Sequence, residues 1–167
     1  KPSLLLMDEP LSNLDYNLKD SLGKIIRNLI KEFETSALIV THDIYDAMKI
    51  SDKIVVLDNG KIIQKGTPNE IYNNPKSKKV ALLFGETNFI PLSMFPDEKN
   101  YFFDAVTKLP LISIRPNQFI IFSKNTDVKG KVFCGEIKSL TKIGAKTQLE
   151  LDCDNLILKI SLNYSEK

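Results

Sequence analysis

Two neighbouring carboxylates, Asp8 and Glu9, directly follow the apolar run of residues 4–7. A continuous apolar run is typical of a strand buried in a parallel sheet, and open α/β sheets bind ligands at the carboxyl ends of such strands. Adjacent carboxylates that lose hydration repel each other unless a cation or a polar substrate compensates their charge. The pair therefore predicts a site for Mg²⁺ and an activated water.

A third side chain capable of chemistry, His42, is the only histidine of the chain. It follows a second apolar run, residues 37–40. A lone histidine is by default a structural or surface residue. Two buried parallel strands, however, end at the same rim of their sheet, so we expect His42 to lie on the rim that carries Asp8.

The segment that leads from these carboxylates to the first helix contains Ser12 and Asp15. The helix itself is predicted over residues 18–33, where apolar side chains recur at helical spacing and lysine, arginine and asparagine occupy the other face. Either Ser12 or Asp15 could cap this helix, because both side chains accept hydrogen bonds from first-turn N–H groups.

Further elements follow along the chain. Asn59-Gly60 predicts a hairpin, since both residues suit the positive φ of a tight turn. Pro68 suits the first position of a helix. The predicted strands lie at residues 53–57 and 62–65, and the predicted helices at residues 67–75 and 78–84.

The sequence changes in character after Gly85. Short apolar stretches separated by Pro, Asn, Asp and Gly then predict an all-β barrel or sandwich. We therefore expect an α/β part in residues 1–85 and a small all-β part in residues 86–167.

The composition is that of an ordinary folded protein, with 167 residues, 43% hydrophobic and 26% charged. A net charge of +2 is too close to neutral to indicate nucleic-acid binding. No apolar run approaches the roughly 20 residues that span a bilayer, and no signal-peptide pattern opens the chain. Cys134 and Cys153 lack zinc-site spacing, so we expect two buried, reduced thiols.

The phosphate-binding pattern G-x-x-x-x-G-K-[ST] does not occur in the sequence. In that pattern, backbone N–H groups cradle nucleotide phosphates. The chain also opens on Lys1 without a starting methionine. We therefore expect it to be the carboxyl-terminal part of a longer protein.

Four segments, in this order, resemble the ATP-binding subunits of ABC transporters. Residues 4–10 resemble the Walker B strand with its following glutamate, residues 12–15 the D-loop, and residues 40–43 the switch-histidine loop. Residues 64–75 resemble the importer branch, which serves sugars, polyamines, iron, sulfate or molybdate.

The resemblance implies a role for each candidate residue. Asp8 would help to hold Mg²⁺ on the β- and γ-phosphates of ATP, through water. Glu9 would be the general base or would orient the attacking water. His42 would contact the γ-phosphate and the catalytic glutamate, and Ser12 and Asp15 would reach the site of a partner subunit in a closed dimer.

The resemblance also implies a fold. Residues 1–85 would be part of a P-loop NTPase sheet with its helices. Residues 86–167 are similar to the TOBE type of β domain, built like an OB-fold, on the evidence of residues 114–116, 130–132 and 143–144. The β domain is shorter than in many members of the family, so it is expected to lack a strand or two.

The implied function is that of an ATPase subunit of an importer. Two such subunits would bind MgATP between them on the cytoplasmic face of the membrane, and hydrolysis would drive solute uptake through permease subunits served by a solute-binding protein. Because the phosphate loop, Q-loop and signature motif are missing, we expect this chain alone to be inactive.

Two other functions remain open. The β part could be a non-enzymatic module that binds a small oxyanion, a sugar or an oligonucleotide, with the α/β part as a scaffold. A soluble ABC ATPase of repair or translation is disfavoured by residues 64–75 and by the appended β part, because both resemble importers.

Overall fold

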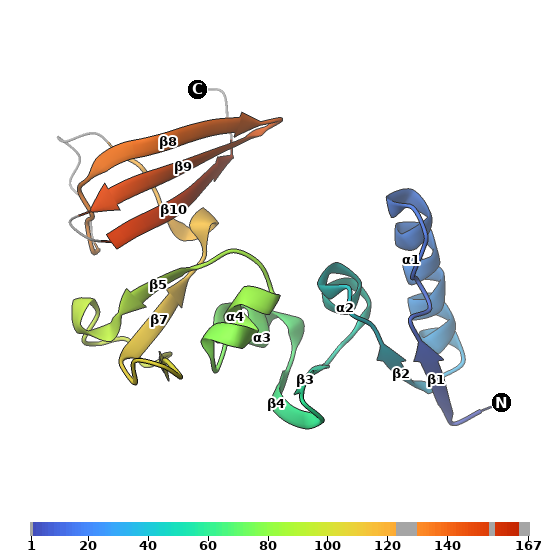
Figure 1. Ribbon diagram of the computed structural model, residues 1–167. Coiled ribbons are helices and arrows are strands. Elements are labelled where there is room, and N and C mark those ends of the chain that lie inside the picture. The colour runs from blue at the N-terminus through green and yellow to red at the C-terminus, as the bar shows by residue number, and fades with distance from the viewer. Residues whose placement is uncertain (1, 123–129, 154–155, 164–167) are drawn as a thin grey trace. The chain divides into compact units, whose positions relative to one another are not determined.

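The computed structural model describes residues 2–122, 130–153 and 156–163. The chain forms two compact units, Lys1–Tyr72 and Asn73–Lys167. Figure 1 shows the helices and strands of both units. No helix in the described part of the chain combines the length and the apolar composition needed to cross a bilayer.

A parallel strand pair organises the first unit. Strand β1 (Leu4–Asp8) pairs with β2 (Ser36–Val40), and helix α1 (Tyr16–Glu32) lies between them in sequence. The register aligns Asp8 with Val40, so the carboxyl ends of both strands meet at one edge. The predicted parallel arrangement is thus confirmed.

The predicted burial of these strands is wrong. The side chains of Leu6 and Leu38 are 70% and 57% exposed. A strand becomes buried only when further strands or helices cover its faces and edges. In the described residues the sheet consists of β1 and β2 alone, which leaves most of its apolar side chains open to solvent.

Helix α2 (Ile44–Ile50) packs against α1. Leu11 and Ile50 are buried, and a Cβ added at Gly23 of α1 would lie 3.1 Å from the Ile50 side chain. Arg27 of α1 donates a hydrogen bond to the Ile50 carbonyl (3.1 Å) and pairs with Asp52 (2.9 Å). This close approach fixes α2, and the loop before it, against α1.

The hairpin predicted at Asn59-Gly60 is confirmed. Strands β3 (Ile54–Asp58) and β4 (Lys61–Gly66) are antiparallel, and both turn residues have positive φ, 47° and 74°. Helix α3 (Pro68–Asn73) then begins at the predicted proline. Its start is stabilised by reciprocal hydrogen bonds between Thr67 and Glu70 (2.8 and 3.3 Å).

The described residues of the second unit form helix α4, two short 3₁₀ turns and two small antiparallel sheets. Figure 1 shows β8, β9 and β10 as one ribbon sheet, with β5 and β7 in the other. Helix α4 (Lys78–Leu83) precedes a sheet of order β5-β7-β6, formed by Asn88–Pro91, Pro110–Ile114 and Phe102–Phe103. The other sheet, of order β10-β9-β8, is formed by Leu156–Asn163, Lys146–Cys153 and Glu136–Ile143. Short 3₁₀ turns lie at η1 (Leu92–Met94) and η2 (Pro116–Gln118).

The core of the second unit joins both sheets. Ile90 and Ile112 come from the first sheet, and Leu149, Leu158 and Ile160 come from the second. The side chain of Asn88 also links them, because it accepts from Lys159 N–H (2.7 Å) and donates to the Lys159 carbonyl (2.8 Å). The sheets therefore meet through side chains.

The expected barrel is not seen in the described residues. These residues form a mixed α/β structure with several small antiparallel sheets and no closed barrel. Closure needs a continuous ladder of backbone hydrogen bonds, whereas β5 and β10 are joined through the Asn88 side chain. Residues 123–129, which precede β8 in the sequence, lie outside the described residues.

The two cysteines differ from expectation in their burial. Cys134 is exposed and Cys153 is half-buried, whereas both were expected to be buried. The second compact unit begins at Asn73 and contains helix α4. Helix α4 belongs with the second unit because the buried Arg115 donates to the carbonyls of Ala81 (3.0 Å) and Gly85 (2.9 Å).

Candidate functional site

The turn after β1 holds Glu9 in a defined position. Glu9 has a φ of 47°, a left-handed conformation that ends the strand. Its N–H still donates to the Val40 carbonyl at 2.8 Å. Its own carbonyl accepts from the N–H (3.1 Å) and the hydroxyl (2.9 Å) of Ser12. Three hydrogen bonds thus fix the backbone that carries the carboxylate.

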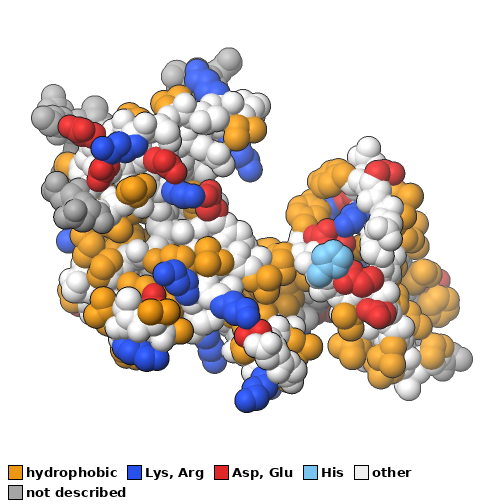
Figure 2. Space-filling model, in the orientation of Figure 1, with side chains coloured by type: hydrophobic (Ala, Val, Ile, Leu, Met, Phe, Trp, Pro, Cys, Tyr) orange, Lys and Arg blue, Asp and Glu red, His pale blue; other side chains and the backbone are white. Residues whose placement is uncertain are grey.

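The structure brings Glu9 and His42 into direct contact. One carboxylate oxygen of Glu9, Oε1, lies 2.7 Å from His42 Nδ1 and accepts from the His42 N–H at 3.0 Å. Figure 2 shows the single histidine, in pale blue, beside acidic side chains in red. The imidazole is 82% exposed, while the Glu9 side chain is 32% exposed. The pair therefore lies at the surface of this unit, open to a ligand.

The contact also favours the ionised form of Glu9. The hydrogen bond with the His42 side chain holds the pKa of the Glu9 carboxyl below its ordinary value, and the His42 N–H acts in the same direction. Desolvation opposes this effect. Glu9 is accordingly an anion at neutral pH. A fixed carboxylate of this kind can accept a hydrogen bond from a water and orient it.

Asp8 lies at the end of β1, one residue before Glu9, and its side chain is exposed. No group of three or more His, Cys, Asp or Glu side chains among the described residues could hold a metal ion unaided. Mg²⁺ usually keeps several waters and takes one or two carboxylates together with substrate phosphates. An accessible carboxylate such as Asp8 fits this way of binding Mg²⁺, in which waters and phosphates supply the other ligands.

Ser12 and Asp15 occupy different places in the turn. Asp15 is the N-cap of α1, with its carboxylate accepting from Leu18 N–H at 3.0 Å. Ser12 binds the Glu9 carbonyl and does not cap the helix. Of the two capping alternatives, the structure thus selects Asp15. Contact of either residue with a partner subunit stays a prediction.

Sequence reasoning missed the residues that support these loops. Lys19 of α1 pairs with Asp43 (2.6 Å) and Asp46 (3.4 Å) of the loop and helix that follow His42. The hydroxyls of Tyr16 and Tyr45 lie 2.9 Å apart. In the sequence these side chains look like ordinary solvated helix residues. Their partners lie 24 to 29 residues away, so no local pattern connects them.

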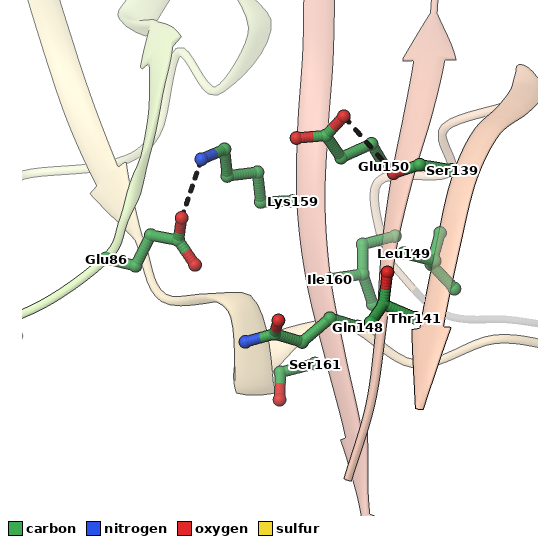
Figure 3. Close-up of a pocket in the computed structure, with 9 residues that line it drawn as sticks. All are labelled: Glu86, Ser139, Thr141, Gln148, Leu149, Glu150, Lys159, Ile160 and Ser161. Carbon is green, nitrogen blue, oxygen red and sulfur yellow. Dashed lines mark hydrogen bonds and ion pairs between the residues drawn. The ribbon is translucent and has the colours of Figure 1, made fainter. Parts of the chain in front are cut away.

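A polar pocket lies wholly within the second unit (Figure 3). It has a volume of about 150 Å³ and opens on β8, β9 and β10. Lys159 and Glu86 point toward each other and form an ion pair of 2.6 Å, and Ser139 donates to Glu150 at 3.3 Å. Two carboxylates and one lysine make it a poor site for an anion.

Comparison with known proteins identifies relatives of this chain, although no protein-family model matches it. It is 31% identical over 175 residues to the Fe(3+) ions import ATP-binding protein FbpC of Photorhabdus laumondii, a match that covers 99% of this chain and 49% of that protein. It is 37% identical over 145 residues to the spermidine/putrescine import ATP-binding protein PotA of Malacoplasma penetrans, covering 79% and 24%. FbpC of Escherichia coli K12 is 45% identical over 91 residues, covering 54% and 26%.

The names of these relatives agree with the family that the sequence motifs resemble. The chain is a homologue of the ATP-binding subunits of ABC importers. The match with FbpC of Photorhabdus laumondii includes nearly all of this chain but only about half of the length of that relative.

Proposed function

We propose that this chain supplies the catalytic carboxylate and histidine of an ATP-hydrolysing subunit of an ABC importer. The observation that carries the proposal is the contact of 2.7 Å between Glu9 and His42, at the edge where β1 and β2 end. Phosphoryl transfer to water needs a positioned nucleophile and neutralised charge more than covalent catalysis. A fixed, anionic glutamate beside an exposed histidine suits the first of these needs.

Each residue then has a separate task. Glu9 accepts a hydrogen bond from the attacking water and orients it. His42 holds the Glu9 carboxylate through both its ring and its backbone N–H, and its exposed ring edge remains available to the γ-phosphate. Asp8 binds Mg²⁺, through water, and the bound ion supplies charge neutralisation at the phosphates. Ser12 and Asp15 contact the nucleotide site of a second subunit.

For the whole protein we propose the arrangement that its relatives suggest. Two copies form a homodimer on the cytoplasmic face of the membrane, peripheral to permease subunits that receive solute from a binding protein. Residues 1–85 belong to the ATPase domain and residues 86–167 to a TOBE-type β domain with a regulatory or dimer-stabilising role. The names of the relatives support this arrangement, because they describe ATP-binding proteins for the import of iron or of spermidine and putrescine.

The direct experiment is ATP hydrolysis by the complete protein that contains this chain. Glu9→Gln keeps the shape of the side chain but removes its charge, and we expect hydrolysis to fall by about 100-fold or more with MgATP binding retained. The matched control is Glu34→Gln, at an exposed glutamate of the same unit. Hydrolysis at the normal rate in the Glu9 variant would contradict the proposal.

We further propose that this chain, taken alone, neither binds MgATP tightly nor hydrolyses it, because it carries no phosphate loop. Isothermal titration calorimetry of the chain with MgATP tests this directly. Heat changes that fit micromolar affinity would refute it.

A second function, a ligand-binding β module without catalysis, is favoured by the polar pocket of the second unit. Its hydroxyl, amide and carboxylate groups suit a neutral, hydroxylated molecule better than an oxyanion or an oligonucleotide. Thermal-shift measurements with sugars, sulfate and oligonucleotides distinguish these ligands. A shift with a sugar that is lost in Glu150→Gln would support this function.

A further inference from the structure

Two tyrosines connect the helices that follow the candidate loops. Tyr16 is the first residue of α1 and comes directly after Asp15, and Tyr45 lies three residues after His42. Their hydroxyls are 2.9 Å apart, and their ring centroids are separated by 5.8 Å at a tilt of 44°. The Lys49 ammonium lies 5.4 Å from the centroid of the Tyr45 ring, on its face.

An ion pair connects the same two helices one turn further along. Lys19 contacts the carboxylates of Asp43 (2.6 Å) and Asp46 (3.4 Å). Asp43 is also the N-cap of α2, accepting from the N–H groups of Tyr45 and Asp46. The first turn of α1 is thus tied to the cap of α2, and this cap is adjacent to His42.

These contacts close a ring with the candidate site. Glu9 is bound to Ser12, which leads through Asp15 into α1. The tyrosine pair and the Lys19 ion pair cross from α1 to α2, and the chain returns from Asp43 to His42. The ring closes at the contact between His42 and Glu9. A change in spacing at the tyrosine pair must therefore be taken up elsewhere in the ring.

We propose that Tyr16 and Tyr45 are positioning residues, whose mutual contact sets the place of His42 relative to Glu9. The inference rests on the proposed function of Glu9 and His42. Neither tyrosine hydroxyl forms a hydrogen bond with Glu9 or His42, so any influence on this pair is indirect. Their side chains are 64% and 51% exposed, which is too exposed for a role in the core of the unit.

A purely structural role would give a different pattern. An exposed hydrogen bond between neutral groups contributes little to global stability, because water replaces it on unfolding. The positioning role instead concerns the local geometry of the His42 loop. The test must therefore measure that loop and not only the unfolding transition.

The first measurement is amide hydrogen exchange of the chain, followed by NMR. The His42 N–H donates to Glu9 at 3.0 Å, so we expect this bond to slow its exchange. In Tyr16→Phe and Tyr45→Phe, which keep the rings, we expect its exchange to accelerate about fivefold, the equivalent of one hydrogen bond. Amides in the middle of α1 and the melting temperature should not change. The matched control is Tyr101→Phe, at an exposed tyrosine of the second unit.

Two results would overturn the inference. Unchanged exchange at His42 in both variants would show that the tyrosine contact does not reach the site. Faster exchange spread evenly over α1 and α2 would show a structural role only. In the double variant Tyr16→Phe/Tyr45→Phe, the His42 N–H should exchange no faster than in the single variants. Each single variant already removes the same hydrogen bond between the two tyrosines.

The second measurement separates this inference from the proposed function. In the complete protein, we expect Tyr45→Phe to lower kcat several-fold with an unchanged KM for MgATP, because binding does not use this contact. If the unaltered protein does not hydrolyse ATP, the proposed function fails, and amide exchange alone decides the positioning role. If it does hydrolyse ATP and both tyrosine variants match it in kcat, the inference is overturned while the proposed function stands.

Discussion

Glu9 adopts a backbone conformation that is uncommon for residues with a side chain. Its φ of 47° lies in the left-handed region, where a Cβ is crowded. Such residues persist when surrounding contacts determine them, and they concentrate at functional sites. Here the bonds to Val40, Ser12 and His42 supply those contacts. The unusual backbone is thus consistent with a carboxylate held in place for chemistry.

Asp43 gives a prediction about pH at the residue scale. The hydrogen bond from Lys19 is the largest cause that lowers the pKa of Asp43 below its ordinary value of 3.8, and desolvation acts against it. The folded chain therefore binds fewer protons here than the unfolded chain. The stabilisation is fully present above pH 3.8 and is lost as the pH falls through the lowered pKa.

The measurement is thermal unfolding of α1 and α2, followed by NMR from pH 7 to pH 2.5. Asp43→Asn keeps a good N-cap but removes the charge, so we expect a lower melting temperature at pH 7 and a weaker loss on acidification. The control is Asp97→Asn, at an exposed residue of the second unit. Parallel curves for Asp43→Asn and the unaltered chain would exclude this contribution.

The sequence predicted part of the candidate site. Asp8, Glu9 and His42 follow the two apolar runs, and parallel strands bring the ends of such runs to one edge. The sequence could not predict the supporting pairs. Lys19 with Asp43 and Tyr16 with Tyr45 depend on how α1 packs against α2, which no local pattern encodes.

At the scale of elements, Asn88 joins the two sheets of the second unit. Its amide pairs with the backbone of Lys159 in β10 and donates to the Ile114 carbonyl of β7 (3.2 Å), and the residue is 5% exposed. Asn88→Leu removes the partner of the Lys159 N–H and of the Lys159 carbonyl, whereas the Ile114 carbonyl still accepts from the Thr87 hydroxyl (3.2 Å). We expect a loss of about 2–4 kcal/mol in the free energy of unfolding, because each unsatisfied buried group costs about 1–3 kcal/mol.

Urea unfolding of the second unit measures this loss. The control is Asn117→Leu, at an exposed asparagine of η2. Equal stability of the two variants would show that Asn88 does not hold the sheets together.

Elements with local signals were predictable, and the connections between them were not. The Asn59-Gly60 turn and the proline at the start of α3 are set by backbone preferences of single residues. The barrel expected for residues 86–167 depended on how distant strands meet. In the described residues they meet through the Asn88 side chain and an apolar core, a long-range arrangement that strand spacing does not determine.

At the scale of the whole molecule, the exposed apolar strands predict self-association. Leu6 and Leu38 are 70% and 57% exposed on a sheet that, in the part of the chain that the structure describes, has only the strands β1 and β2. Exposed apolar strands with unpaired edge groups favour pairing between copies. We expect sedimentation velocity to show larger species as the chain concentration rises, and Leu6→Lys to suppress them.

The control for this measurement is Val106→Lys, at an 87% exposed valine of the second unit. It adds the same charge in the other unit and leaves the apolar side chains of β1 and β2 unchanged, so association should persist. A single monomeric boundary for the unaltered chain at every concentration would contradict the expectation.

The two relatives share the description ATP-binding and differ in the solute that their names give, Fe(3+) ions or spermidine and putrescine. The chain is 31% identical to the first and 37% identical to the second. Under the proposed function, Asp8, Glu9 and His42 serve nucleotide chemistry, so the choice of solute would belong to the permease and binding-protein partners.

The central claim is that Glu9 and His42 act as one unit on the attacking water. A double-mutant cycle in single-turnover ATP hydrolysis by the complete protein tests it most directly, with Glu9→Gln, His42→Ala and the double variant. Groups that act as a unit are strongly non-additive, so the account predicts that the double variant hydrolyses ATP no more slowly than the slower single variant. Losses that multiply in the double variant would show that the two residues act independently and would contradict the account.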